Sequence, residues 1–193
     1  MALDGSIAFA GVARQAELIR DGEISSRELV ELYLHRIQRF DGWLNAMRVV
    51  YWDEVLAEAD AADERRARGE GGPLNGVPIA VKDRFDVAGD VTTFGTVAHG
   101  PPARRDAEIV RRLRAAGAPI LGKTQLPELA IWGMTESRGF GVTRNIPGSP
   151  TTRRAVRAAG PPRPWRPGWR RRPPVRTAPV PCARRRRRVT CSA

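Results

Sequence analysis

The amino-acid composition of this chain changes abruptly near Asn145. Residues 147–193 contain fourteen Arg and ten Pro but no Asp, Glu, Lys, Leu, Ile, Phe or Met. A segment without large aliphatic side chains cannot bury enough apolar surface to offset the entropy lost on folding. We therefore expect a folded part over residues 1–145 and an Arg/Pro-rich, disordered tail over residues 146–193.

The formal net charge of +12 belongs to the tail and not to the folded part. Residues 147–193 carry +14, whereas residues 1–146 carry 19 basic and 21 acidic groups, a net charge of −2. A basic patch that could attract nucleic acid is thus a property of the tail alone.

Metal and thiol chemistry has little support in the sequence. Both cysteines, Cys182 and Cys191, lie in the tail, and the only histidines are His35 and His99. We therefore expect no metal site. The start of the chain has no basic region followed by a sustained apolar stretch, so we expect no signal peptide, no membrane span and a cytoplasmic location.

Two helices are predicted in the first third of the chain. Ser25 and Glu28 have the spacing of a capping box, which marks the start of a helix. Apolar residues then recur at helical spacing: Leu29, Tyr33, Ile37 and Phe40. This pattern predicts a helix that stops at Asp41-Gly42. A second helix is predicted over residues 53–68.

A strand, a helix and a second strand are predicted next. Residues 77–81 form a short apolar run bounded by turn formers, typical of a buried strand, and Pro78 favours an edge position or a strand start. Asp106 is expected to cap a helix that Gly117 closes. The apolar face of that helix is Ile109, Val110 and Leu113. Residues 118–121 form a second buried strand, so the order indicates an α/β fold.

The stretch Gly117–Thr124 matches the phosphate-binding pattern G-x-x-x-x-G-K-[ST] letter for letter. That motif needs a flexible loop between a strand and a helix, with several amides turned toward phosphate. Here Gly117 ends a helix, the residues between the glycines are apolar, and Pro119 has no amide to donate. Leu126-Pro127 interrupts the helix that should follow. We reject nucleotide binding and interpret the stretch as a core strand leaving its helix.

Residues 72–83 read G-P-L-N-G-V-P-I-A-V-K-D, and further short motifs follow in order. They are Thr92–Gly95, Asp106–Arg114, Ala115–Thr124, Leu126–Ala130 and Gly141–Asn145. In order and spacing this set resembles the amidase-signature family. The resemblance implies a mixed sheet flanked by helices, present here in incomplete form.

The resemblance also implies an amide C–N hydrolase or amidotransferase with a Ser–cis-Ser–Lys triad, a small-molecule amide substrate, and no metal or organic cofactor. The identity of the substrate stays open: it could be a small aliphatic or aromatic amide or a fatty amide. The chain could also belong to an amidotransferase that forms glutaminyl-tRNA. In the matching motif, Lys82 takes the position of the family's catalytic lysine. Desolvation at the end of an apolar strand can lower the pKa of an amine and make it a base. The alternative is that Lys82 merely ends a strand at the surface.

Other residues receive roles from the same resemblance. Thr135 and Ser137 fall where the family lines its substrate cleft. Asp83 either positions the ammonium group of Lys82 or caps the next turn. Lys123 is expected to support the structure and to take no part in chemistry.

The family pattern continues with Asn-Pro-Trp near Asn145, a Gly-Ser-Ser-Gly-Gly segment with the bridging serine, and Gly-Ser-Asp-x-x-Gly-Ser with the nucleophile. None of these is present in the sequence. A one-base displacement of the reading frame near Asn145 explains the gap. Each intended codon then joins the third base of one residue to the first two bases of the next.

In the displaced frame, the codons of residues 155–168 are compatible with the sequence G-S-S-G-G-G-P-A-A-A-V-A-A-G. The codons of residues 175–183 are compatible with G-S-D-G-A-G-S-V-R. Residues 147–148 permit P-W. The missing segments thus appear in the expected order. We interpret the tail as non-native, out-of-frame translation of a GC-rich gene, from a natural frameshift or a sequencing error. The chain as written is then expected to be truncated before its nucleophile, inactive and poorly folded.

A different class of function remains open for the tail. The arginine runs 170–172 and 184–188, with Trp165 and Trp169, resemble a basic arm that binds RNA or DNA. Arginine neutralises phosphate and tryptophan stacks on bases, which gives salt-sensitive binding without sequence preference. The same residues follow from the displaced frame, so nucleic acid is expected only as a non-specific partner.

Overall fold

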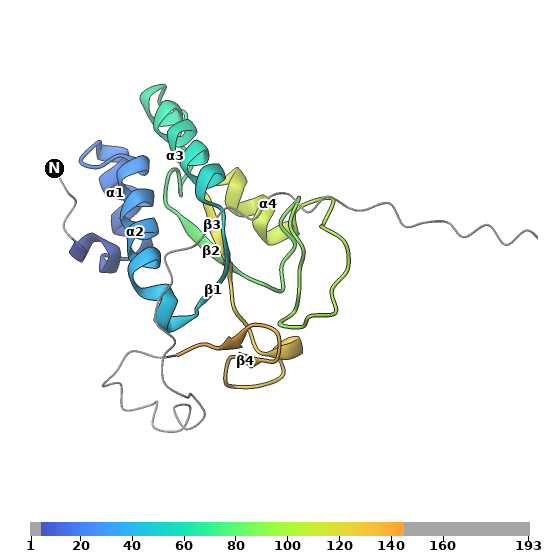
Figure 1. Ribbon diagram of the computed structural model, residues 1–193. Coiled ribbons are helices and arrows are strands. Elements are labelled where there is room, and N and C mark those ends of the chain that lie inside the picture. The colour runs from blue at the N-terminus through green and yellow to red at the C-terminus, as the bar shows by residue number, and fades with distance from the viewer. Residues whose placement is uncertain (1–4, 145–193) are drawn as a thin grey trace, which may run out of the picture. The chain divides into compact units, whose positions relative to one another are not determined.

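The structure is a computed structural model that describes residues 5–144. The predictions for the tail fall outside the described residues: its disorder, its displaced serine segments and its basic arm. Within the described residues, helices cover both faces of a three-stranded sheet (Figure 1). The predicted α/β class, with a mixed sheet between helices, is confirmed.

The first helical layer begins with the 3-10 helix η1 (Gly5–Phe9) and α1 (Val12–Asp21), followed by α2 (Ser26–Leu44). The predicted capping box is present at the start of α2. The Oγ of Ser25 accepts the Glu28 amide at 3.0 Å, and the Glu28 carboxylate accepts the Ser25 amide at 2.9 Å.

The predicted end of α2 at Asp41-Gly42 is wrong, because the helix continues to Leu44. The Asp41 carbonyl accepts the amide of Asn45, which adopts a left-handed conformation with φ +53°. The Asp41 carboxylate accepts the next two amides, from Ala46 and Met47, at 2.7 and 3.1 Å. Asp41 therefore satisfies the groups beyond the helix end and does not terminate the helix.

Helix α3 (Trp52–Ala67) follows the predicted range closely. It packs with α2 against one face of the sheet through a buried cluster. The members of this cluster are Val30, Leu34, Val55, Ala59 and Leu121. Burial of such aliphatic side chains contributes roughly 1.5–3 kcal/mol each, so this cluster fixes the helical layer on the sheet.

The sheet contains β1 (Met47–Val50), β3 (Ile120–Thr124) and β2 (Ile79–Lys82) in that spatial order. Strand β3 is central and lies parallel to β2 and antiparallel to β1. Helix α4 (Glu108–Ala115) connects β2 to β3 and covers the opposite face, where Val110 packs with Val81 and Ile120. The two predicted strands are confirmed, and β2 has the predicted edge position among the described strands.

Asp106 does not cap α4, so that prediction is wrong. The N-cap is Ala107, which has no side-chain cap bond. The Asp106 carboxylate instead accepts the Ala88 amide at 2.8 Å and pairs with Arg114 at 3.1 Å. The predicted closure by Gly117 is confirmed, with φ +92° and its amide bonded to the Arg114 carbonyl.

The structure confirms that Gly117–Thr124 is no phosphate loop. After the turn at Gly117, the stretch forms the central strand β3, and its residues 120–123 are buried. A Cβ on Gly122 would lie 2.2 Å from the carbonyl oxygen of Val49 on the neighbouring strand. The second glycine of the pattern thus serves close strand packing and leaves no room for a ligand.

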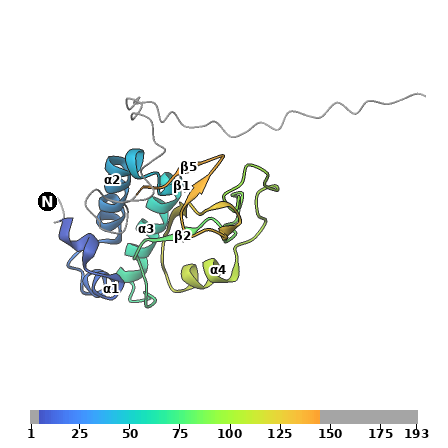
Figure 2. The same ribbon diagram turned by 90° about the horizontal axis from the view of Figure 1, so that it is seen from below.

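The last described residues contain η2 (Glu128–Ala130) and a hairpin of β4 (Glu136–Ser137) and β5 (Gly141–Val142). The hairpin is attached to the turn between α2 and β1 (Figure 2), because Arg144 donates its amide to the Leu44 carbonyl at 2.7 Å. Among the described residues, no helix has the length and apolar character that crossing a membrane requires.

Candidate active site

Lys82 is the last residue of the edge strand β2. Its side chain is exposed and follows the alternation of the strand, in which Val81 is buried and Ala80 is exposed. The backbone of Lys82 is fixed on both sides of the residue. It pairs with Thr124 of β3, and its carbonyl accepts the Arg84 amide at 2.7 Å.

Asp83, the residue after Lys82, is buried with 1% of its surface exposed. Its carboxylate pairs with Lys123 at 3.4 Å and with Nε of Arg48 at 3.0 Å, the latter as an ion pair without hydrogen-bond geometry. It also accepts the hydroxyl and the amide of Thr93. Asp83 therefore turns into the interior, and its carboxylate is not the partner of the Lys82 ammonium group.

Lys123 is fully buried beneath the loop that follows β2. Its Nζ donates to the carbonyl of Val91 and the hydroxyl of Thr92, both at 2.9 Å, and lies 3.7 Å from Asp90. Burial lowers the pKa of Lys123, while Asp90 and Asp83 oppose that shift. The expected structural role of Lys123 is confirmed by this set of contacts.

Arg48, Asp83, Asp90 and Lys123 form a buried ionic cluster, and Tyr51 borders it. Arg48 bonds to Asp90 and donates to the Val91 carbonyl at 3.1 Å. The Tyr51 hydroxyl donates to Asp90 at 2.7 Å, and burial raises the pKa of the Tyr51 phenol well above its ordinary value. Two cations face two carboxylates, so the cluster is neutral as a whole and anchors the loop after Lys82.

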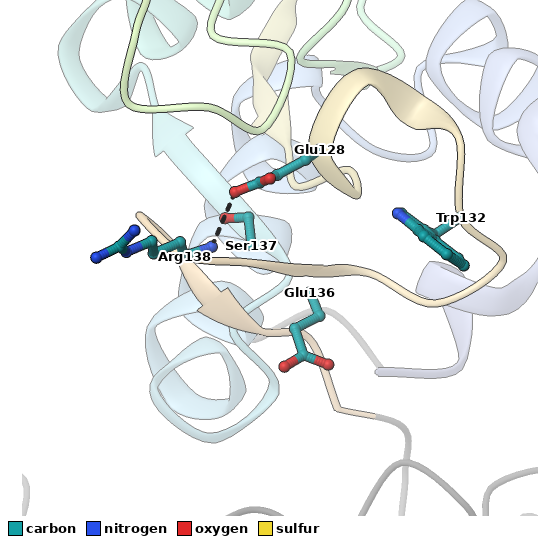
Figure 3. A pocket seen from close by; sticks show the side chains of 5 residues that line it. All are labelled: Glu128, Trp132, Glu136, Ser137 and Arg138. Carbon is teal, nitrogen blue, oxygen red and sulfur yellow. Dashed lines mark hydrogen bonds between the residues drawn. The ribbon is translucent and has the colours of Figure 1, made fainter.

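Thr135 and Ser137 differ in their surroundings. Ser137 is buried and accepts the Phe140 amide on its Oγ at 3.0 Å. It lines an open pocket of about 430 Å³, drawn in Figure 3. The lining residues are Glu128, Trp132, Glu136, Ser137 and Arg138. Thr135 is not in this lining, and its carbonyl accepts the Thr143 amide at 2.9 Å.

The pocket is polar on one side and aromatic on the other. Glu128 accepts the backbone amide of Arg138 at 3.2 Å, the hydrogen bond drawn as a dashed line in Figure 3. The Glu136 side chain points away from Glu128 and Ser137 in Figure 3. Because the Ser137 hydroxyl already accepts a backbone amide, its contact shapes the hairpin. The cleft-lining roles of Thr135 and Ser137 stay predictions.

The amine of Lys82 is not placed next to a hydroxyl group that it could activate among residues 5–144. Its Nζ has no hydrogen-bond or ion-pair partner within that range. A lysine base catalyses acyl transfer only next to a hydroxyl nucleophile and amides that hold the oxyanion. Among the described residues Lys82 has no such neighbours, and its catalytic role stays a prediction. No three His, Cys, Asp or Glu side chains among them are grouped to hold a metal.

Helices on both faces of a mixed sheet, with a lysine exposed where the edge strand ends, define the described residues as part of an α/β domain. The sequence pattern of the amidase family matches residues 28–151. The chain belongs to the amidase family.

The relatives of the chain include amidases and an amidotransferase. AmiB2 of Mycobacterium tuberculosis, named as an amidase, is 57% identical over 139 residues, which cover 72% of this chain and 30% of AmiB2. The A component of the glutamyl-tRNA(Gln) amidotransferase of Thioalkalivibrio sulfidiphilus is 44% identical over 135 residues, covering 69% of this chain and 28% of that component. The chain thus spans about 30% of the length of the relatives that it matches.

A solved structure supports the same assignment. The native peptide amidase of Stenotrophomonas maltophilia superimposes with a TM-score of 0.67 at 35% sequence identity. The match covers 74% of this chain and 31% of the peptide amidase. The amidase-type fold is therefore shown for the matched part, and the comparisons give the nucleic-acid alternative no support.

Proposed function

We propose that residues 1–145 are the N-terminal part of an enzyme that hydrolyses an amide C–N bond, with Lys82 as its catalytic base. The observation that carries this proposal is the position of Lys82 at the exposed end of β2, inside the range that matches the amidase family. The substrate we propose is a small-molecule amide, and Thr135 and Ser137 are proposed to border its cleft. We place the enzyme in the cytoplasm.

In the proposed reaction the neutral amine of Lys82 accepts a proton from a bridging serine. The bridging serine in turn takes the proton of the nucleophilic serine, whose Oγ attacks the amide carbon. The amine of the substrate leaves with a proton, and water then hydrolyses the ester of the serine. Lys82 must lose contact with water for its neutral form to be available, because burial disfavours the ammonium ion.

Both serines are proposed to lie one base out of frame. Residues 155–168 and 175–183 permit the Gly-Ser-Ser-Gly-Gly and Gly-Ser-Asp segments, respectively, after this displacement. The chain as written then has a base with nothing to activate. We expect it to hydrolyse no amide.

The test is a gene in which one base is restored near codon 145, expressed beside the unaltered gene. We expect the restored protein to hydrolyse simple aliphatic or aromatic amides and the 193-residue chain to be inactive. Lys82→Ala in the restored protein should lower kcat/KM by roughly 10²–10⁴-fold, the usual contribution of a general base. Activity of the 193-residue chain that depends on Lys82, or a restored protein unaffected by Lys82→Ala, would contradict the proposal.

A further inference from the structure

Asp83, the residue after the proposed base Lys82, is held by contacts from three separate segments of the chain. Its carboxylate is buried and forms ion pairs with Arg48 of β1 at 3.0 Å and with Lys123 of β3 at 3.4 Å. It also accepts the hydroxyl and the amide of Thr93, which lies in the loop after β2. The direction of the Asp83 side chain is therefore fixed by three groups that are not its neighbours in the sequence.

The position of Asp83 determines the direction in which Lys82 points. Successive side chains of a strand point to opposite faces of the sheet, so Val81 and Asp83 share one face and Lys82 points to the other. Val81 packs with Val110 of α4 in a buried cluster, and Asp83 is buried among charged groups. Because both neighbours of Lys82 are held in the interior, its side chain is exposed on the opposite face.

Thr93 closes the loop after β2 over the Asp83 carboxylate. It is buried, and its hydroxyl and its amide both donate to the same carboxylate oxygen of Asp83. The Thr93 hydroxyl also accepts the amide of Gly95 at 3.2 Å. A hydroxyl has a single proton to donate, and here that proton is committed to Asp83. Removal of the hydroxyl would therefore leave a buried carboxylate with one donor fewer, at a cost in free energy.

The ionic cluster around Asp83 fits a need for exact placement better than a need for stability. The transfer of charged groups out of water is expensive, and well-packed apolar side chains of the same volume often stabilise a fold as well or better. Charged groups joined by directional contacts instead specify one arrangement, because any displacement leaves a buried charge without its partner. The residue that such an arrangement places next to itself in the chain is Lys82.

We infer that Asp83 and Thr93 are positioning residues, which hold the backbone that carries the amine of Lys82. This inference rests on the proposed function. A general base must lie within hydrogen-bond reach of the proton that it accepts, and a misplacement of about 1 Å can lower the rate by about 100-fold. Neither Asp83 nor Thr93 takes part in the proton transfer. Both act through Lys82 by limiting where its amine can lie.

The kinetic test uses the protein whose frame is restored near codon 145. Asp83→Asn keeps the shape of the side chain and removes its charge. We expect kcat to fall by roughly 10–100-fold, because the base is displaced, while KM stays unchanged. The matched control is Asp106→Asn, because Asp106 also pairs with an arginine and accepts a backbone amide, from Arg114 and Ala88 respectively. It should leave kcat unchanged.

A pair of substitutions at Thr93 repeats the kinetic test without a change of charge. Thr93→Val keeps the shape of the side chain but removes the hydroxyl that donates to Asp83. Thr93→Ser keeps that hydroxyl. We expect valine to lower kcat and serine to retain it, with KM unchanged in both variants. Circular dichroism shows which variants fold, and the Thr93 pair decides the kinetic test if Asp83→Asn does not.

A second measurement needs no enzymatic activity and uses the 193-residue chain. Its only lysines are Lys82 and Lys123, so labelling with ¹⁵N-lysine gives one backbone amide signal from each in a nuclear magnetic resonance spectrum. The heteronuclear Overhauser effect of each signal reports the mobility of that amide. We expect both amides to be rigid, Thr93→Val to make the Lys82 amide mobile, and Thr93→Ser to leave it rigid. Lys123, in the central strand β3, serves as the internal reference.

The two measurements separate this inference from the proposed function. The inference is overturned if Asp83→Asn lowers kcat no more than Asp106→Asn, if Thr93→Ser behaves like Thr93→Val, or if the Lys82 amide is already mobile in the unsubstituted chain. A rigid Lys82 amide that Thr93→Val loosens, together with an inactive restored-frame protein, contradicts the proposed function but supports the hold on Lys82. A restored-frame protein whose activity needs Lys82 but not Asp83 or Thr93 contradicts the inference alone.

Discussion

At the scale of single residues, burial separates the two lysines that follow apolar runs. Lys82 is exposed at the end of β2, whereas Lys123 is fully buried on the neighbouring strand β3. Of the two, Lys123 pairs with carboxylates, those of Asp83 and Asp90. A similar local sequence therefore gives one lysine available for chemistry and one that anchors a loop.

Removal of the buried charge tests the anchoring role. Lys123→Met leaves Asp83 and Asp90 with one cation, Arg48, so we expect the free energy of unfolding to fall by about 3 kcal/mol. Urea denaturation measures the change. Lys82→Met is the control and should change stability by less than about 0.5 kcal/mol, as exposed substitutions do. Equal effects of the two substitutions would refute the anchoring role.

Because Tyr51 is buried as a neutral phenol, we expect the free energy of unfolding to fall at alkaline pH. Its pKa is raised by burial and by its hydrogen bond to Asp90. The neutral phenol therefore stabilises the fold fully below the unfolded pKa of about 10, and this contribution is lost as the pH rises above that value.

Tyr33→Phe makes Tyr51 the only tyrosine, because the chain contains two. In this variant the ultraviolet absorbance of tyrosinate should rise only together with the loss of helical circular dichroism. Ionisation near pH 10, the ordinary value for tyrosine, in a chain that remains folded would show that Tyr51 is not held as the structure describes.

At the scale of elements, the helix ends show which capping interactions can be predicted from the local sequence. The capping box of α2 and the glycine closure of α4 formed as predicted, because both use hydrogen bonds within a few residues. Asp41 and Asp106 were misjudged, since their carboxylates bind amides beyond the expected helix ends. Whether a carboxylate caps its own helix or a neighbouring loop depends on tertiary contacts.

The capping box predicts a measurable contribution to α2. Ser25→Ala removes the acceptor of the Glu28 amide and should destabilise the chain by about 1 kcal/mol. Ser25→Asp keeps an acceptor at the same place and should preserve stability to within a few tenths of a kcal/mol. Thermal unfolding of the two variants provides the comparison, and equal losses would show that the cap does not stabilise α2.

Gly122, in the central strand β3, should tolerate replacement poorly. Gly122→Ala places a Cβ 2.2 Å from the Val49 carbonyl oxygen, so we expect a loss of about 3 kcal/mol. Gly89 has φ +87° with nothing within 4 Å of an added Cβ. Gly89→Ala should therefore cost only about 1 kcal/mol of backbone strain. Denaturant unfolding that ranks the two variants in the opposite order would contradict the packing of β1 on β3.

At the scale of the whole molecule, local patterns predicted the layers but not the long-range pairs. The helix α3 and the strands β2 and β3 followed from periodicity and turn residues. The strand β1 was missed, because its four residues are only half-buried and lack the alternation of a typical strand. The buried ionic cluster was also missed, since it joins Arg48 to Asp83 and Asp90 to Lys123 across many residues.

The candidate site could be predicted only in part for a similar reason. Lys82 was found through a resemblance of motifs, and its exposure at a strand end agrees with both a catalytic and a surface role. The partners that would distinguish these roles are the two serines that we propose for the displaced frame. The composition of the tail is therefore the observation on which the proposed frame displacement, and the expected inactivity of this chain, depend most.

The most direct measurement is the DNA sequence across codons 140–183 in independent reads. We predict that a frame displaced by one base spells Gly-Ser-Ser-Gly-Gly over residues 155–159 and Gly-Ser-Asp-x-x-Gly-Ser over residues 175–181. Third bases that spell other amino acids in that frame would contradict the displaced frame, and with it the assignment of Lys82 to a serine hydrolase.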